Sequence, residues 1–91
     1  MKRLTNTKII CHVSEWDDAN HNLVSEDYEQ TFSNEMTISG LQCKAREILS
    51  QWENGIVKIF WGKYQIGTST QKYNQGICEY LTNFGKKLCG R

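Results

Sequence analysis

The sequence predicts one α+β domain, residues 1–91, in which two helices cover one face of an antiparallel sheet of about four strands, in the order β-β-α-β-β-α. Three observations support this fold. Apolar and polar residues alternate before position 33, an apolar stripe with helical spacing follows residue 40, and β-branched and aromatic residues then flank a Gly-Lys turn. A chain of 91 residues has room for a single hydrophobic core.

The N-terminal part of the chain is predicted to form a β-hairpin. Residues 8–14 alternate between apolar and polar side chains, which indicates a half-buried strand. Ile9, Cys11 and Val13 share one face of this strand, and Ile10, His12 and Ser14 share the other. Trp16 comes next, and the turn-forming residues 17–22 indicate a polar loop. Residues 23–33 alternate again and predict a second strand, which carries acidic side chains outward.

A helix is predicted from Gly40 to about Glu53. Ser39 is a suitable N-cap with Gln42 three residues later, which is the capping-box pattern. The apolar stripe at helical spacing consists of Leu41, Ala45, Ile48, Leu49 and Trp52. The pair Asn54-Gly55 is expected to end the helix in a left-handed conformation.

A second hairpin is predicted from the β-branched and aromatic residues 56–61 and the returning strand 64–68, joined by a Gly62-Lys63 turn. This register gives three cross-strand pairs on the core-facing side: Trp61 with Tyr64, Ile59 with Ile66, and Val57 with Thr68. The opposite face would carry Ile56, Lys58, Phe60, Gln65 and Gly67.

The last element is predicted to be a helix over residues 74–84, because Ile77, Leu81 and Phe84 lie on one helical stripe and Gly85 can end it. The complete predicted core consists of Val57, Ile59, Ile66, Leu41, Ala45, Leu49, Trp52, Ile77 and Leu81. The chain contains no proline and no internal repeat.

The four cysteines are interpreted as thiols. They are far apart in the sequence, and no two of them form a Cys-x-x-Cys pair, which disfavours a zinc site. Three lie among apolar residues and are expected in the core, namely Cys11, Cys43 and Cys78, whereas Cys89 in the tail is expected to be exposed. The N-terminal residues include cations but no apolar stretch after them, so we expect a cytoplasmic protein without a membrane span, which also disfavours disulfides.

Enzymatic activity has little support in the sequence. There is no glycine-rich phosphate loop and no nucleophile elbow. Asp17, Asp18 and His21 are ordinary turn residues without the spacing of a calcium loop. Cys11 and His12 are neighbours on a strand and point to opposite faces, so they cannot form a nucleophile pair. We therefore expect a protein that is not an enzyme and needs neither a metal nor a cofactor.

The charges are strongly polarised along the chain. Between Ile9 and Cys43 there are seven of the ten carboxylates and no Lys or Arg, whereas the flanking segments are basic. An acidic surface can steer association with a basic protein partner, and aromatic residues within it can serve as anchors. The predicted partner-binding residues are Glu15, Trp16, Asp17, Asp18, Glu26, Asp27, Tyr28 and Glu29. The alternatives are a solvated acidic loop, and core packing for Trp16.

Nucleic-acid binding is the second hypothesis. Cations and rings from the second hairpin and the C-terminal segment could form a basic patch with stacking side chains, with Tyr73 nearby. The residues concerned are Lys58, Phe60, Lys63, Lys72, Lys86 and Lys87. The formal net charge of only +1 disfavours this hypothesis, because domains that depend on phosphate contacts usually have a stronger basic excess.

One segment resembles a known group of proteins. The run from Thr37 to Leu49, followed by Gly55-Ile56-Val57-Lys58-Ile59, is similar in arrangement to small anti-CRISPR proteins of phages and mobile elements, which have strands, one such helix and a return hairpin. The similarity is architectural and covers about the middle third of the chain. It implies a non-enzymatic inhibitor that occupies a nucleic-acid-binding surface of a CRISPR-Cas effector, an RNA-guided nuclease complex.

Overall fold

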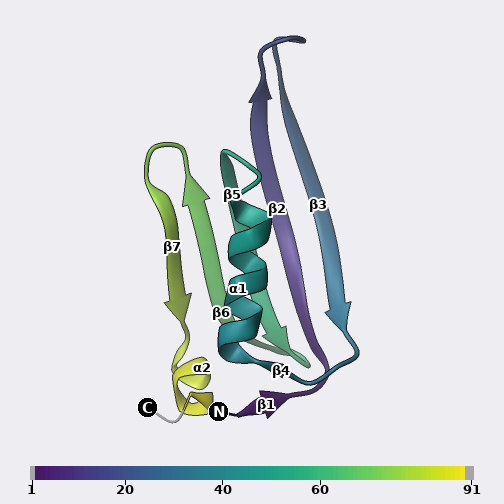
Figure 1. The fold of residues 1–91 in the computed structure, drawn as a ribbon, viewed down its shortest axis with the longest axis vertical. Helices are drawn as coiled ribbons and strands as arrows, with labels where there is room; N and C mark the ends of the chain where they lie inside the picture. The colour runs from purple at the N-terminus through teal and green to yellow at the C-terminus, as the bar shows by residue number, and fades with distance from the viewer. Residues whose placement is uncertain (1, 90–91) are drawn as a thin grey trace.

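The computed structural model describes residues 2–89, which form a five-stranded antiparallel sheet, a separate two-stranded sheet and two helices (Figure 1). The elements are β1 (Arg3–Leu4), β2 (Thr7–Asp17), β3 (Asn22–Phe32), β4 (Met36–Thr37), α1 (Ile38–Leu49), β5 (Asn54–Trp61), β6 (Tyr64–Lys72), β7 (Gly76–Leu81) and α2 (Asn83–Leu88). The large sheet has the order β3-β2-β5-β6-β7, and β1 pairs with β4. The α+β class is confirmed, whereas the prediction of about four strands in the order β-β-α-β-β-α is wrong.

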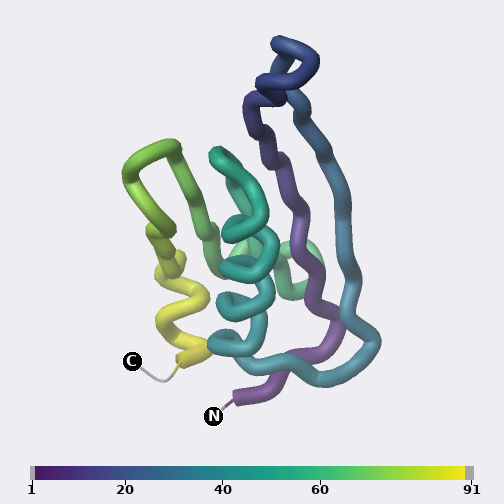
Figure 2. Tube along the Cα trace, turned by 45° about the horizontal axis from the view of Figure 1, so that its top comes forward, coloured from purple at the N-terminus to yellow at the C-terminus, as the bar shows by residue number. Residues whose placement is uncertain are grey.

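The core lies between α1 and one face of the large sheet (Figures 1 and 2). Six of the nine predicted core residues are buried: Leu41, Ala45, Leu49, Val57, Ile59 and Ile66. The inward-facing residues of β2, Ile9, Cys11 and Val13, are buried with them. The opposite face, which we call the open face, is covered by no other element of residues 2–89. The period-two alternation along each strand produces these two different faces.

The boundaries of α1 differ from the prediction at both ends. The N-cap is Thr37, whose Oγ1 accepts a hydrogen bond from the Gly40 N–H at 3.0 Å, and the predicted N-cap Ser39 lies inside the helix. The helix ends at Leu49, before the expected Asn54-Gly55 stop. Gly55 instead belongs to β5, where a Cβ atom would lie 2.7 Å from Val13 Cγ1. A glycine is needed there for close packing.

The second hairpin keeps its predicted turn but changes register. Gly62 has a φ of 58°, which glycine adopts readily, and Trp61 pairs with Tyr64 as predicted. A β-bulge between Ile59 and Phe60 then shifts the pairing by one residue on β6. The corrected pairs are Ile59 with Gly67 and Val57 with Ser69. Because of this shift, Gly67 is buried, while Thr68 pairs with Lys58 on the open face.

The predicted C-terminal helix over residues 74–84 is wrong. Most of that segment forms β7, which pairs with β6, and only Asn83–Leu88 is helical. Ile77 is therefore 38% exposed rather than in the core, and Cys78 is exposed as well. An unpaired β6 would leave a row of backbone groups without partners, and pairing with β7 satisfies them.

Several other residues that were predicted to be buried are partly or fully exposed. Trp52 and Leu81 pack against the core but are only partly buried, and Cys43 on α1 is exposed rather than in the core. Tyr64 is 51% exposed at the end of β6, where its ring lies against Phe84 of α2. Neither helix within residues 2–89 is long and apolar enough to cross a membrane.

Candidate protein-binding hairpin

The β2–β3 hairpin projects beyond the rest of the sheet (Figure 1). The two strands pair continuously from Thr7 with Phe32 to Asp17 with Asn22. On its other side, however, β2 pairs with β5 only as far as Ser14. Residues 15–24 therefore form a two-stranded ribbon, which we call the projecting ribbon, and no third strand from residues 2–89 pairs with it.

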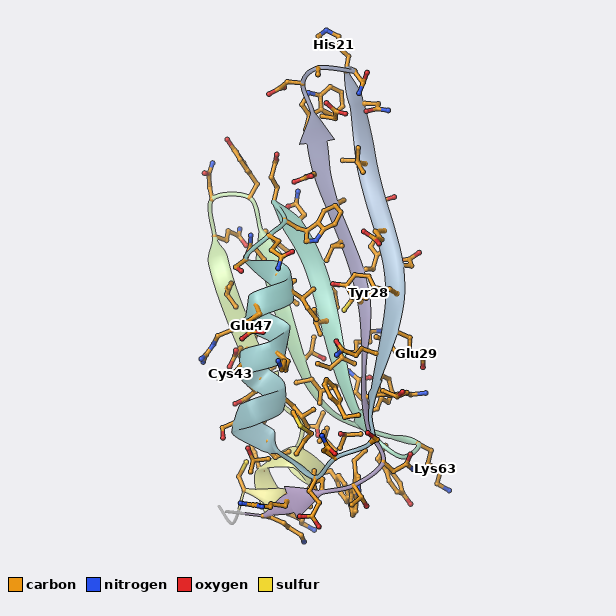
Figure 3. The ribbon with its side chains drawn as sticks, turned by 45° about the vertical axis from the view of Figure 1, so that its right-hand side comes forward. His21, Tyr28, Glu29, Cys43, Glu47 and Lys63 are labelled. Carbon is orange, nitrogen blue, oxygen red and sulfur yellow. The ribbon has the colours of Figure 1, made fainter. Side chains whose placement is uncertain are left out.

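The turn at the end of the projecting ribbon is organised by Asp17. Its carboxylate accepts hydrogen bonds from the backbone N–H groups of Ala19 at 3.0 Å and Asn20 at 3.3 Å, and from Asn20 Nδ2 at 2.8 Å. These bonds, chiefly the one from the Asn20 side chain, lower the pKa of Asp17. His21 at the tip completes the turn with a φ of 52° (Figure 3). Asp17 has a structural role in this turn, in addition to any contact with a partner.

Two large apolar side chains are exposed on the projecting ribbon. Trp16 pairs with Leu23 across the two strands, and the side chains are 49% and 61% exposed. Their exposure rules out core packing as the role of Trp16. Val24, on the other face of the ribbon, is exposed as well. The ribbon thus presents an apolar pair that no other part of residues 2–89 covers.

The predicted acidic surface is divided between two faces of the hairpin. Asp27 and Glu29 lie on the open face, whereas Glu26 lies opposite Val13 on the face that carries α1. The two residues on the open face already have cationic or imidazole partners: His12 contacts Asp27, and Lys8 Nζ lies 3.1 Å from Glu29 Oε1. The sequence-based interpretation of these acids as one contiguous surface is therefore wrong.

Three carboxylates on or beside the projecting ribbon remain without a cation. Glu15, Asp18 and Glu26 form no ion pair with any residue in the range 2–89. Glu15 and Glu26 share the face of Val24, and Asp18 lies in the turn next to the exposed Trp16. These carboxylates can interact with the cations of a partner without first breaking an internal ion pair.

Tyr28 is not a surface anchor, in contrast to the prediction. Its side chain is half-buried and packs against the core on the inner face of β3 (Figure 3). Burial and the neighbouring Cys11 raise the pKa of Tyr28 to about 12. Tyr28 therefore contributes to the packing of β3 against the core.

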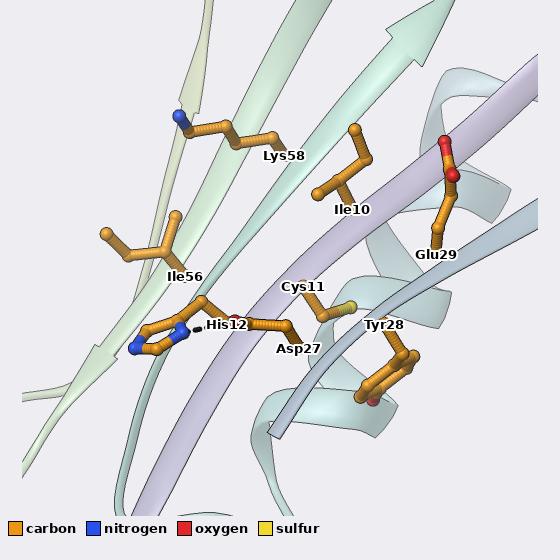
Figure 4. A pocket seen from close by; sticks show the side chains of 8 residues that line it. All are labelled: Ile10, Cys11, His12, Asp27, Tyr28, Glu29, Ile56 and Lys58. Carbon is orange, nitrogen blue, oxygen red and sulfur yellow. Dashed lines mark hydrogen bonds and ion pairs between the residues drawn. The ribbon is translucent and has the colours of Figure 1, made fainter. Parts of the chain in front are cut away.

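A shallow pocket of about 430 Å³, which the sequence analysis missed, lies beside the hairpin on the open face (Figure 4). Ile10 and Ile56 form its apolar floor, and its polar rim includes His12, Asp27, Glu29 and Lys58. Figure 4 shows the His12 imidazole and the Asp27 carboxylate in contact at the rim. The floor depends on the pairing of β2 with β5, a long-range contact that alternation within one strand does not reveal.

The residues of the second hypothesis do not form one basic patch. Lys58 and the half-buried Phe60 lie on the open face, but Lys63 and Lys72 lie at opposite ends of β6. Figure 3 shows Lys63 at the far end of the molecule from His21. Lys86 and Lys87 lie on α2, and Tyr73 is exposed after β6. Phosphate contacts would have to come from separate regions of the surface.

Neither a search for metal-binding side chains nor comparisons with known proteins assigns a function to the chain. Residues 2–89 contain no group of three or more His, Cys, Asp or Glu side chains that could hold a metal ion. Comparisons with known proteins found no protein-family model, no curated protein and no solved structure that matches the chain. The geometry defines a small α+β domain with one helix-covered face, one open face and a projecting acidic ribbon, and a functional assignment has to start from these features.

Proposed function

We propose that this protein is a non-enzymatic binding module that docks on a basic surface of a partner protein through the projecting ribbon. The supporting observation is the exposed Trp16–Leu23 pair on one face of the ribbon, together with carboxylates that form no ion pair within residues 2–89: Asp18 in the turn, and Glu15 and Glu26 on the opposite face. Large aromatic side chains supply much of the affinity of protein interfaces when they enter a pocket of the partner. The surrounding carboxylates would accelerate association with a cationic surface and reject an acidic one.

The organised turn supports this proposal because it reduces the conformational entropy that is lost on binding. The Asp17 carboxylate holds the tip through three hydrogen bonds, and the two strands keep Trp16 and Leu23 side by side before a partner arrives. A side chain that is already positioned loses less conformational entropy on binding. The ribbon is only two strands wide, so a partner that encloses its end can contact both faces.

The partner is expected to carry Lys and Arg around an apolar depression. Basic surfaces of this kind commonly bind the phosphates of nucleic acids, so the module would compete with a nucleic acid for its partner. The resemblance of residues 37–49 to small anti-CRISPR proteins makes an RNA-guided nuclease complex one candidate. In that role the protein would act as an inhibitor.

The test is a binding measurement with a partner isolated by affinity purification from the native host. We expect Trp16→Ala combined with Leu23→Ala to weaken binding by about a hundredfold or more, since hot-spot residues cost 2 kcal/mol or more each when truncated. Charge reversal of Glu15 and Glu26 to Lys should mainly slow association and reduce its dependence on salt. Reversal of Lys63 and Lys72 to Glu is the matched control and should change little. Normal binding by both ribbon variants would contradict the proposal.

The alternative function is nucleic-acid binding through Lys58 and Phe60 on the open face, and a gel-shift assay can detect it. A gel-shift assay at low and moderate salt should show no complex if the acidic ribbon is the working surface. Binding that falls steeply with salt, and that is lost on Lys58→Ala, would instead support direct phosphate contacts.

A further inference from the structure

The outer edge of β3 is long, regular and unpaired. Within the described part of the chain, β3 is the last strand of the sheet and pairs only with β2, from Asn22 to Phe32 (Figures 1 and 2). This pairing contains no bulge, and the strand contains no proline. All of its side chains are exposed except those of Tyr28 and Phe32, which are partly buried. An edge with these properties can template the addition of another strand.

One hydrogen bond identifies the backbone groups that point outward from β3. The Gly62 N–H donates to the Asn6 carbonyl at 2.8 Å, so that carbonyl points toward β5. In a planar peptide the next N–H, that of Thr7, points the opposite way, toward β3. Backbone groups alternate in direction along an antiparallel strand, so the odd-numbered residues of β2 bond β3.

The same alternation continues on β3. The β3 partners of the odd-numbered β2 residues are even-numbered, for example Glu26 opposite Val13 and Tyr28 opposite Cys11. The odd-numbered residues of β3 therefore direct their N–H and C=O groups away from the sheet. The outward donors and acceptors belong to Leu23, Ser25, Asp27, Glu29 and Thr31. Together they form a ladder that an extended chain can complete.

We propose that the β3 edge binds an extended, Lys- or Arg-rich segment of a partner protein as an additional strand of the sheet. This inference rests on the proposed function and specifies how the partner is held. Main-chain hydrogen bonds would supply affinity, and alternate side chains of the added strand would supply specificity. Cations at alternate positions would face Asp27 and Glu29 on the open face, where they would share these carboxylates with His12 and Lys8, and a neighbouring cation could reach the unpaired Glu26 on the other face.

Charge also argues against a second copy of this chain as the added strand. An antiparallel β3–β3 pair that uses the whole strand is centred on Asp27 and places the two Asp27 carboxylates opposite each other. Like charges directly opposite each other destabilise a strand pair. The imidazole of His12 contacts Asp27 within each copy, but no Lys or Arg between Ile9 and Cys43 supplies a full positive charge beside it. The acidic edge disfavours self-association and favours a basic partner.

The probe for the test is a synthetic peptide of about ten alternating Thr and Lys residues, the length of a typical strand. A peptide of alternating Thr and Glu is its control. We expect the Thr-Lys peptide to slow hydrogen exchange at the amides of Ser25, Asp27 and Glu29, measured by NMR, while the Thr-Glu peptide has no effect. Absence of binding at millimolar peptide, or binding without protection of these amides, would overturn the proposal. Protection of the same amides without peptide, together with dimer formation, would identify a second copy and would also overturn it.

A proline substitution tests the main-chain contact directly. Ser25→Pro removes an outward N–H without changing the charge or the ladder to β2, and proline is tolerated on the free side of an edge strand. It should weaken peptide binding about tenfold or more, since the added strand loses a hydrogen bond and gains a steric conflict. Ser25→Ala, which keeps the N–H, should bind like the unmodified protein. Equal binding by Ser25→Pro, with its circular dichroism unchanged, would overturn the proposal.

The two proposals fail in different ways. Loss of native-partner binding in the Trp16→Ala/Leu23→Ala variant, with unchanged binding in Ser25→Pro, would leave the proposed function standing and remove strand addition. Normal binding of the native partner by both ribbon variants would remove the proposed function itself. Loss of binding in both Trp16→Ala/Leu23→Ala and Ser25→Pro is the result expected if the partner uses the ribbon and the β3 edge together.

Discussion

Arg46 on α1 forms an ion pair with Glu79 on β7, with Nε 2.7 Å from Oε1, and Nη2 donates to Oε2 at 3.2 Å. The Glu79 side chain is only 17% exposed, whereas that of Arg46 is more than half exposed. This pair connects the helix to the edge strand that the sequence analysis interpreted as helical. The Oε2 atom accepts the hydrogen bond from Nη2, whereas the buried Oε1 atom accepts no hydrogen bond from residues 2–89 and is stabilised by the nearby positive charge alone.

We predict that Arg46→Ala destabilises the fold by about 1–2 kcal/mol, because it leaves a mostly buried carboxylate without its cation. Urea denaturation monitored by tryptophan fluorescence measures this loss. Lys44→Ala is the matched control on the same helix, where the exposed contact to Glu47 is 3.7 Å long, and should change stability by less than about 0.5 kcal/mol. Equal effects of the two substitutions would show that the Glu79 pair adds no stability.

Gly85→Ala is predicted to destabilise the protein by about 1–3 kcal/mol, despite the higher helix propensity of alanine. A Cβ atom at this position would lie 2.2 Å from the backbone oxygen of Ile66, so α2 would have to move away from β6. Thermal unfolding should show a lower midpoint for this variant. Lys86→Ala, at an exposed position of the same helix, provides the control. A higher midpoint for Gly85→Ala would contradict the close packing.

The four thiols should differ in reactivity. Cys11 is buried at 2% exposure, and burial raises its pKa, whereas Cys43, Cys78 and Cys89 are exposed. A chromogenic disulfide reagent at neutral pH should therefore modify the three exposed thiols in the folded protein, and Cys11 only after unfolding. A variant with the exposed cysteines replaced by serine isolates the slow thiol. Rapid modification of that variant would contradict the burial of Cys11.

The turn at the hairpin tip should depend on pH through Asp17. The folded-state pKa of Asp17 is lowered from 3.8, so its stabilising effect is fully present above pH 3.8 and is lost as the pH falls through the lowered value. NMR hydrogen exchange at Ala19 and Asn20 should accelerate in that acidic range relative to unstructured peptide amides. Asp17→Ala should accelerate exchange at neutral pH as well. An unchanged exchange rate in Asp17→Ala would show that the carboxylate does not hold the turn.

The sequence by itself determined the features that depend on local chemistry. Alternation grouped Ile9, Cys11 and Val13 on one face of β2, which the structure shows to be the buried one, and the apolar spacing of Leu41, Ala45 and Leu49 identified the buried side of α1. The Gly62-Lys63 turn was predictable because glycine readily adopts the positive φ that the turn requires. The sequence also has no Lys or Arg between Ile9 and Cys43, and the binding of a basic partner there stays a prediction.

Other features were decided only by the tertiary structure, since they depend on residues far apart in the sequence. Ile77 and Leu81 fit a helical stripe, but the free edge of β6 recruits this segment as β7 because backbone hydrogen bonds outweigh weak local helix preference. The bulge at Ile59 likewise arises between two paired strands. The free edge of β3 follows from strand order and pairing, whereas the division of Glu26 and Asp27 onto opposite faces already follows from alternation along one strand. Burial of a common core sets these long-range contacts, which no local pattern specifies.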